Sequence, residues 1–163
     1  MNSAVGRSCD ACTACCFTHA VAGVKPGGEW CPHCEIGAGC RIYLDRPAQC
    51  RNFSCLWLKS DWGDEDDRPD RLGVVVSDLT VPVGDRRIRL VQFIETEAGA
   101  IDQGRVARLI EMYRAKGLAI CIARREPSGS YADASYEIPA NLLAQSELDQ
   151  FRLELGKLSP SAG

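Results

Sequence analysis

The sequence lacks the long apolar runs of a membrane-spanning or exported chain. No window reaches the roughly 18 uninterrupted apolar residues of a transmembrane helix, and the first ten residues, MNSAVGRSCD, contain no apolar signal-peptide core. A basic excess is also missing, because the 163 residues carry a net charge of −3. We therefore expect a cytoplasmic protein with no membrane partner, and its charge does not favour a nucleic-acid partner.

The second half of the chain lacks the usual marks of catalysis. Residues 71–163 contain no histidine, no glycine-rich phosphate loop and no nucleophile elbow. Their only cysteine, Cys121, lies between Ile120 and Ile122, where a cysteine normally packs as a small apolar residue. We assign no catalytic residue, no reaction and no protein partner from these features.

Large apolar side chains are scarce in residues 1–60, which are rich in Cys, Gly and Pro. Burial alone would offset the backbone entropy of folding poorly, since that entropy costs about 1 to 2 kcal/mol per residue. The composition predicts an irregular module, residues 1–60, stapled by metal. An acidic, solvated linker is expected at residues 61–70 (DWGDEDDRPD), followed by a small folded domain at residues 71–163.

The pattern of residues 71–163 predicts an α+β domain. A β-branched run at 72–83, turn residues at 84–85 and an alternating run at 86–97 predict a β-hairpin. Apolar residues at helical spacing then predict a helix, with Asp102 as its N-cap and Gly117 at its end.

Two more strands and a closing helix complete this domain. The strands are expected at 118–126 and 130–139, separated by the turn Pro127-Ser128-Gly129, and the helix is marked by Leu148, Phe151 and Leu155. The order is β-β-α-β-β-α. Short connections favour a small antiparallel sheet with two helices over a doubly wound parallel sheet.

Cysteine is what the sequence has in abundance. Crowded thiols in a reducing compartment are more often metal ligands than disulfides. Nine of the ten cysteines fall in the first 55 residues, and all nine are candidate metal ligands: Cys9, Cys12, Cys15, Cys16, Cys31, Cys34, Cys40, Cys50 and Cys55.

The spacing within CDACTACC, residues 9–16, predicts chelation. Cys9, Cys12 and Cys15 form two overlapping C-x2-C units, each of which can aim two sulfurs at one ion. Structural zinc sites take one such pair from each of two chain segments. The same run is typical of iron–sulfur ligation, where a further cysteine completes the cluster. The expected cofactor is therefore zinc or iron, the latter as an ion or as an iron–sulfur cluster.

The adjacent pair Cys15 and Cys16 is difficult to place on one ion, because neighbouring Cα atoms lie only about 3.8 Å apart. Two centres, or one centre beside a spare thiol, would explain the pair. His19 and His33 could each replace a sulfur or simply support the site. Arg46 and Arg51 could balance thiolate charge, or be solvated.

The combination of these cysteine motifs resembles a known family. The joint presence of CDACTACC, Cys31 and the block GCRIYLDRPAQCRNFSC, residues 39–55, is similar to the YkgJ-type cysteine-cluster family, described as a zinc- or iron-chelating domain. The resemblance covers about a third of the chain. It implies ligand roles for every N-terminal cysteine except Cys34, whose position is matched least securely.

Flagellin lysine methylases look like distant relatives through the same cysteine pattern. This chain shows no evident cofactor-binding domain for methyl transfer, so that activity is not carried over. Three hypotheses remain: a metal-binding module with a structural role, an iron–sulfur protein that transfers electrons or supports an enzyme, and a metal-handling protein. A thiol–disulfide oxidoreductase is less favoured, because no βαβ pattern accompanies the C-x2-C units.

Overall fold

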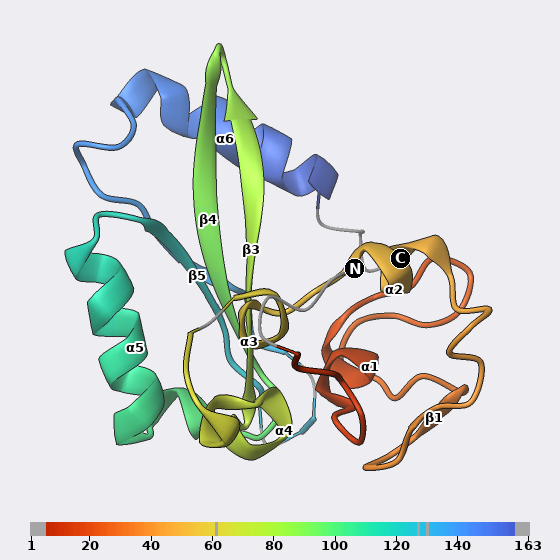
Figure 1. The fold of residues 1–163 in the computed structure, drawn as a ribbon. Coiled ribbons are helices and arrows are strands. Elements are labelled where there is room, and N and C mark those ends of the chain that lie inside the picture. Colours follow the sequence, from red (N-terminus) through yellow and green to blue (C-terminus); the bar gives the residue numbers. More distant parts are fainter. Residues whose placement is uncertain (1–5, 61, 127, 130, 159–163) are drawn as a thin grey trace.

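The computed structural model describes residues 6–60, 62–126, 128–129 and 131–158. Two groups of elements lie side by side in it (Figure 1). The cysteine-rich segment forms one, drawn in red and orange, and a sheet with helices forms the other. Pro127 and Ser130, which fall in the predicted turn and fourth strand, lie outside the described residues.

Only short elements form in the cysteine-rich segment. They are α1 (Ala14–Thr18), β1 (Cys34–Glu35), β2 (Gly39–Cys40), α2 (Ala48–Asn52) and α3 (Leu56–Lys59). β1 and β2 pair antiparallel. This irregular chain path agrees with the scarcity of apolar residues, while the metal that was expected to staple it remains a prediction.

The second group has the predicted order of main elements. It contains η1 (Glu65–Asp67), α4 (Pro69–Leu72), β3 (Val74–Val83), β4 (Arg86–Glu95), η2 (Ala100–Asp102), α5 (Gly104–Ala115), β5 (Ala119–Ala123), β6 (Ser135–Glu137) and α6 (Gln145–Leu158). The predicted hairpin is confirmed, since β3 and β4 pair antiparallel along their whole length. The fold is a mixed α+β fold.

The prediction of a wholly antiparallel sheet is wrong. The sheet order is β3-β4-β5-β6, and β4 pairs with β5 in parallel, because α5 returns the chain to the same end of the sheet before β5 begins. A βαβ unit therefore exists after all. None of the N-terminal cysteines belongs to it, so it provides no support for a thioredoxin-like thiol pair.

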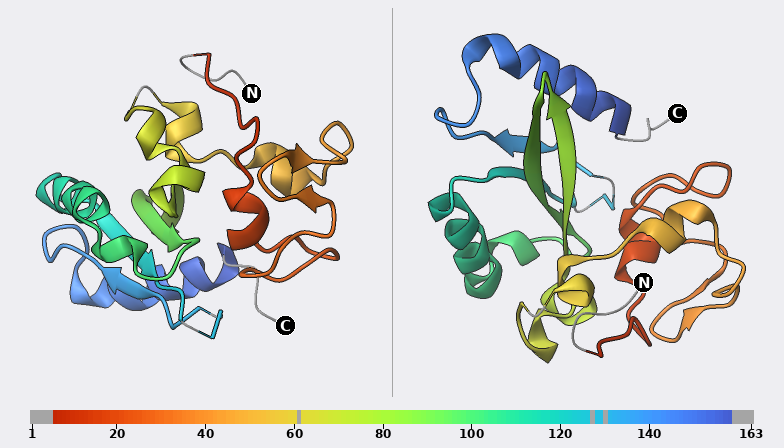
Figure 2. Two further views of the ribbon diagram at one scale, coloured as in Figure 1. Left: turned by 90° about the horizontal axis from the view of Figure 1, so that it is seen from below. Right: turned by 45° about the horizontal axis from the view of Figure 1, so that its top comes forward.

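Strand alternation gives the sheet two buried faces. On β5, Ile120 and Ile122 pack in the cluster that includes residues of α5, whereas Cys121 packs with Phe151 of α6. The two helices therefore cover opposite faces of the sheet (Figure 2). Cys121 is 3% exposed, as expected for a cysteine that serves as a small apolar residue.

Two local expectations need correction. Asp102 does not cap α5, whose N-cap is Gln103 without a side-chain cap; Asp102 instead pairs with Arg124 at 2.9 Å. The expected solvated linker contains η1 and the start of α4, and its Asp67 is buried and accepts hydrogen bonds from Arg105 at 2.6 and 2.8 Å. Packing against the sheet thus begins earlier than the acidic composition indicated.

Among the helices of the described ranges, none is long and apolar enough to cross a membrane.

Candidate functional site

One cavity collects most of the N-terminal thiols. It has a volume of about 740 Å³ and lies where the cysteine-rich segment meets β3, which contributes Asp78 to its wall. His19 and His33 also line it. Among the described residues that form the wall, Cys34 is absent. Eight cysteines are present: Cys9, Cys12, Cys15, Cys16, Cys31, Cys40, Cys50 and Cys55.

A tight turn followed by a short helix places the first four of these thiols. The Cys12 backbone N–H donates to the Cys9 carbonyl at 2.7 Å, and Asp10 between them has a left-handed φ of 38°. α1 then carries Cys15 and Cys16. Successive residues on a helix point about 100° apart, so these two side chains leave α1 in different directions.

The second cysteine block reaches the same cavity through backbone contacts. The Cys31 N–H donates to the Cys16 carbonyl at 3.1 Å, which fixes Cys31 beside α1. Cys40 lies on β2, Cys50 on α2, and Cys55 is the N-cap of α3. The two cysteine groups therefore line the same cavity, and their role as ligands stays a prediction.

The donor chemistry fits a thiophilic metal, while a closed coordination site is not formed. Thiolates are the preferred ligands of zinc and of iron–sulfur clusters. In the part of the chain that the structure describes, no group of three or more Cys, His, Asp or Glu side chains is arranged to hold a metal ion. A metal would have to draw these sulfurs together as it binds.

Burial raises the pKa of several of the thiols. It is the main reason why the pKa of Cys9 and of Cys55 is raised and that of Cys12 is raised to about 12. The pKa of Cys15 is raised well above its ordinary value, chiefly by its hydrogen bond with Cys16. Neutral thiols therefore dominate this wall at neutral pH, and a cation is the natural counterpart that would let them ionise together.

Cys16 behaves differently from its neighbours. The hydrogen bond with Cys15 lowers the pKa of Cys16 to about 6, and a hydrogen bond with Cys34 and the charge of Lys25 act in the same direction. Cys34 is therefore a neighbour of Cys16, although it does not line the cavity. It also bonds to Thr13, and its own pKa is raised to about 11, mainly by burial.

Lys25 is a site residue that the sequence did not reveal. It is 8% exposed, lines the cavity, and its ammonium donates to the Phe17 and Pro26 carbonyls, both at 2.9 Å. Nearby Cys31 and Cys16 favour its charged form, whereas burial lowers its pKa overall. Lys25 supplies fixed positive charge at the thiol wall, and no spacing pattern marks it in the sequence.

The two arginines considered as charge partners have different roles. Arg46 lines the cavity, stacks on the Tyr43 ring with its guanidinium 3.8 Å from the centroid, and partly offsets the raised pKa of Cys9. The Arg51 guanidinium donates to the Arg46 carbonyl at 2.6 Å. Arg46 therefore faces the thiols, and Arg51 stabilises the backbone that carries Arg46.

His19 is packed inside the site. Its ring lies 3.9 Å from that of Phe53 between centroids, and its Nδ1 is 2.7 Å from the Thr18 hydroxyl. Burial lowers the pKa of His19 to about 4, so the imidazole is neutral at pH 7. A neutral imidazole could replace a sulfur or support the thiols, and both roles remain open for His19 and for His33.

Several contacts fix the thiol cavity to the second half of the chain. The Arg7 guanidinium donates to the Trp57 and Trp62 carbonyls at 2.8 and 2.7 Å, and the Trp62 side chain packs against the core cluster of the sheet. Arg125 lies over the Phe17 ring at 4.5 Å. Asp78 on β3 forms an ion pair with Lys59, which also lines the cavity. The site is therefore built on both parts of the molecule.

Comparison of the chain with protein-family models, with curated proteins and with solved structures found no match. The resemblance to the YkgJ-type family therefore rests on the cysteine pattern alone and remains a prediction.

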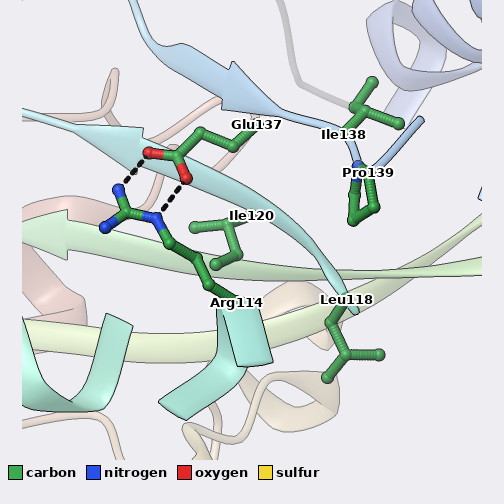
Figure 3. A pocket seen from close by; sticks show the side chains of 6 residues that line it. All are labelled: Arg114, Leu118, Ile120, Glu137, Ile138 and Pro139. Atoms are coloured by element: carbon green, nitrogen blue, oxygen red, sulfur yellow. Dashed lines mark hydrogen bonds and ion pairs between the residues drawn. The ribbon is translucent and has the colours of Figure 1, made fainter. Parts of the chain in front are cut away.

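A second, smaller hollow of about 260 Å³ lies beside β5 (Figure 3). Arg114 and Glu137 face each other there, joined at 2.6 Å between Nε and Oε2. The remaining lining is apolar and comes from Leu118, Ile120, Ile138 and Pro139. Without a nucleophile or a metal ligand besides the paired Glu137, this hollow offers less chemistry than the thiol cavity.

Proposed function

We propose that this chain is a metal-binding cysteine-cluster protein that chelates zinc or iron through its N-terminal thiolates, with a structural or metal-handling role. The observation that carries the proposal is the convergence of eight cysteines, from both halves of the cysteine-rich segment, on one cavity. So many soft donors at one place favour a thiophilic metal. The nine N-terminal cysteines are the candidate ligands, and Cys34 is the least favoured because it lies outside the cavity wall.

The charges around the cavity support an anionic metal–thiolate centre. Four thiolates around one Zn²⁺ leave a net charge of −2, which needs cationic neighbours. Lys25 and Arg46 both line the cavity. The charge of Lys25 lowers the pKa of Cys16, and the charge of Arg46 opposes the rise in the pKa of Cys9. The proposal includes a location in the reducing cytoplasm, because reduced thiols are free to bind metal.

The number of thiols favours a second candidate, an iron–sulfur protein that transfers electrons or supports an enzyme. Cys9, Cys12 and Cys15 keep the C-x2-C-x2-C spacing of ferredoxin clusters, and the cavity supplies further sulfurs to complete a cluster. No reaction is assigned to the chain in either case.

Anaerobic purification followed by elemental analysis and an absorption spectrum tests both candidates. Zinc in whole-number ratio and no visible colour support a structural module, and labile, substoichiometric metal supports metal handling. Brown protein with broad absorption near about 400 nm supports the iron–sulfur alternative. Protein that carries no metal, and takes up neither zinc nor iron when either is supplied anaerobically, would overturn the proposal.

A further inference from the structure

The Arg7 side chain binds the far end of the cysteine-rich segment, 50 residues along the chain. Its guanidinium donates to four backbone carbonyls: Trp57 at 2.8 Å, Ser60 at 3.2 Å, Trp62 at 2.7 Å and Gly63 at 2.6 Å. The guanidinium carbon also lies 4.8 Å from the centre of the Trp57 ring. We call this set of contacts the Arg7 clasp.

The clasp uses carbonyls that α3 leaves open. The last carbonyls of a helix have no partner within it, and those of Trp57 and of the C-cap Ser60 follow this rule in α3. An arginine guanidinium carries five N–H donors on a planar fork, whereas a lysine ammonium carries three donors on one atom. Four acceptors spread over residues 57–63 therefore suit arginine better than lysine.

The clasp lies beside the first and the last cysteine of the cavity. Cys9 follows Arg7 by two residues, and Cys55, the N-cap of α3, precedes Trp57 by two residues. Two residues of extended chain span at most about 7 Å. Arg7 and Leu58 of α3 also line the cavity. The clasp therefore brings both ends of the cysteine-rich segment to the same cavity.

The middle of the segment has attachments of its own. The Cys31 N–H donates to the Cys16 carbonyl at 3.1 Å, and Cys34 pairs with Cys40 between β1 and β2. The Thr13 hydroxyl accepts the N–H of residue 37 at 3.2 Å. None of these contacts involves Arg7, so loss of the clasp should free the two ends and leave the middle in place.

We propose that Arg7 is a positioning residue of the thiol cavity, which holds Cys9 and Cys55 at one site through its clasp on the carbonyls of residues 57–63. A cavity whose two ends are already joined loses less chain entropy when a metal draws its thiols together. Arg7 should therefore raise metal affinity without being a ligand. The effect on affinity rests on the proposed function, whereas the effect on the two thiols does not.

The first test compares thiol exposure in full-length, metal-free wild type, Arg7→Met and Arg7→Lys. Arg7→Met keeps an apolar stem beside the Trp57 ring and loses every donor. Iodoacetamide alkylation, followed by peptide fragmentation and mass spectrometry, should be about fivefold faster at Cys9 and Cys55 in Arg7→Met, and less accelerated in Arg7→Lys. Loss of a positive charge alone would slow alkylation, so the faster rate reports exposure.

Two cysteines away from the clasp serve as references within the same chain. Alkylation of Cys31, in the middle of the segment, and of Cys121, buried in the sheet, should change by less than about twofold. Arg152→Met is the matched control, because Arg152 is exposed on α6, and it should leave every rate unchanged.

Two alkylation results would overturn the positioning role. One is an unchanged rate at Cys9 and Cys55 in Arg7→Met. The other is a rise at Cys121 as large as that at Cys9, because it would show that Arg7 supports the whole fold rather than the two ends of the cysteine-rich segment.

The second test measures Zn²⁺ affinity of the same variants anaerobically against a coloured chelator. Affinity should fall about tenfold in Arg7→Met and less in Arg7→Lys. Equal affinity in wild type and Arg7→Met would contradict the effect of the clasp on metal binding. If wild-type protein binds neither zinc nor iron, the proposed function itself fails, and the alkylation rates then decide the role of Arg7 separately.

Discussion

Cys12 lies beside Asp70, so that the negative charge of Asp70 raises the pKa of Cys12 and the Cys12 thiol helps to lower that of Asp70. The contact joins the turn before α1 to α4, which packs at the start of the sheet. A carboxylate beside a thiol disfavours the thiolate, so Asp70 adds to the effect of burial on the pKa of Cys12.

Replacing this carboxylate should make Cys12 more reactive. In Asp70→Asn the negative charge is lost. Arg68, which pairs with Asp70 at 2.6 Å in the wild-type chain, loses that partner. Both changes lower the pKa of Cys12, and its alkylation by iodoacetamide at pH 8 in metal-free protein should rise roughly two- to tenfold. Peptide mass spectrometry gives the rate at this cysteine. Asp66→Asn, an exposed acid of the same segment, is the control, and equal rates in both variants would contradict the contact.

Removing the ammonium of Lys25 should have the opposite effect on Cys16. The pKa of Cys16 is lowered first by its hydrogen bond with Cys15 and further by the charge of Lys25. Lys25→Gln keeps a polar donor near the Phe17 and Pro26 carbonyls and loses the charge. Alkylation of Cys16 near pH 6 should slow by a few-fold. Lys157→Gln, at an exposed site on α6, should leave the rate unchanged, and an unchanged rate in Lys25→Gln would refute this charge effect.

Metal affinity should rise with pH. Burial raises the pKa of Cys9 and Cys55 and, to about 12, that of Cys12, so these thiols hold their protons at pH 7. Each must release a proton when it becomes a ligand, and acidification therefore competes with the metal. Zinc affinity measured against a chelator should fall steeply from pH 8 to pH 6, by more than one factor of ten. Affinity that is constant over this range would show that thiols are not the ligands.

The sheet half of the molecule should depend on one buried carboxylate. Glu95 is 1% exposed, and its two oxygens accept the Ile101 and Arg125 backbone N–H groups at 2.9 and 2.7 Å. Glu95→Ala leaves both donors unsatisfied in the interior, and the free energy of unfolding should fall by about 3 kcal/mol in urea denaturation. Glu95→Gln, which keeps one acceptor, should lose less.

Glu97→Ala provides the control for this measurement, because Glu97 is exposed two residues further along the chain. Its unfolding free energy should change by no more than about 0.5 kcal/mol. Similar losses in the two alanine variants would contradict the role assigned to the Glu95 carboxylate.

Local patterns predicted the order of the main elements of the second half, although β6 (Ser135–Glu137) is shorter than the strand expected at 130–139. β-branched runs on either side of Gly84 and Asp85 predict the hairpin, and that hairpin is present. The parallel pairing of β4 with β5 was not predicted, because short turns favour antiparallel neighbours. The connection between these two strands is instead a helix of 12 residues, which returns the chain to the same end of the sheet. Which strands become neighbours depends on packing that a local pattern does not contain.

Cysteine spacing predicted the gathering of thiols, and it did not predict their neighbours. Lys25 carries no motif, and its place depends on two backbone carbonyls that only the folded loop brings together. Asp70 lies in an acidic stretch and Asp78 in a strand sequence, and neither carries a motif. Asp70 nevertheless lies beside Cys12, and Asp78 lines the cavity. Charged groups far along the chain join the site through tertiary contacts, which cysteine spacing cannot report.

X-ray absorption spectroscopy of anaerobically purified, metal-loaded protein tests the central claim most directly. The first shell of the bound zinc or iron should consist of sulfur, at about 2.3 Å in the case of zinc. A sulfur shell that loses intensity in the Cys12→Ser, Cys31→Ser double variant would support ligation by the N-terminal thiols. A first shell made only of oxygen and nitrogen would contradict it.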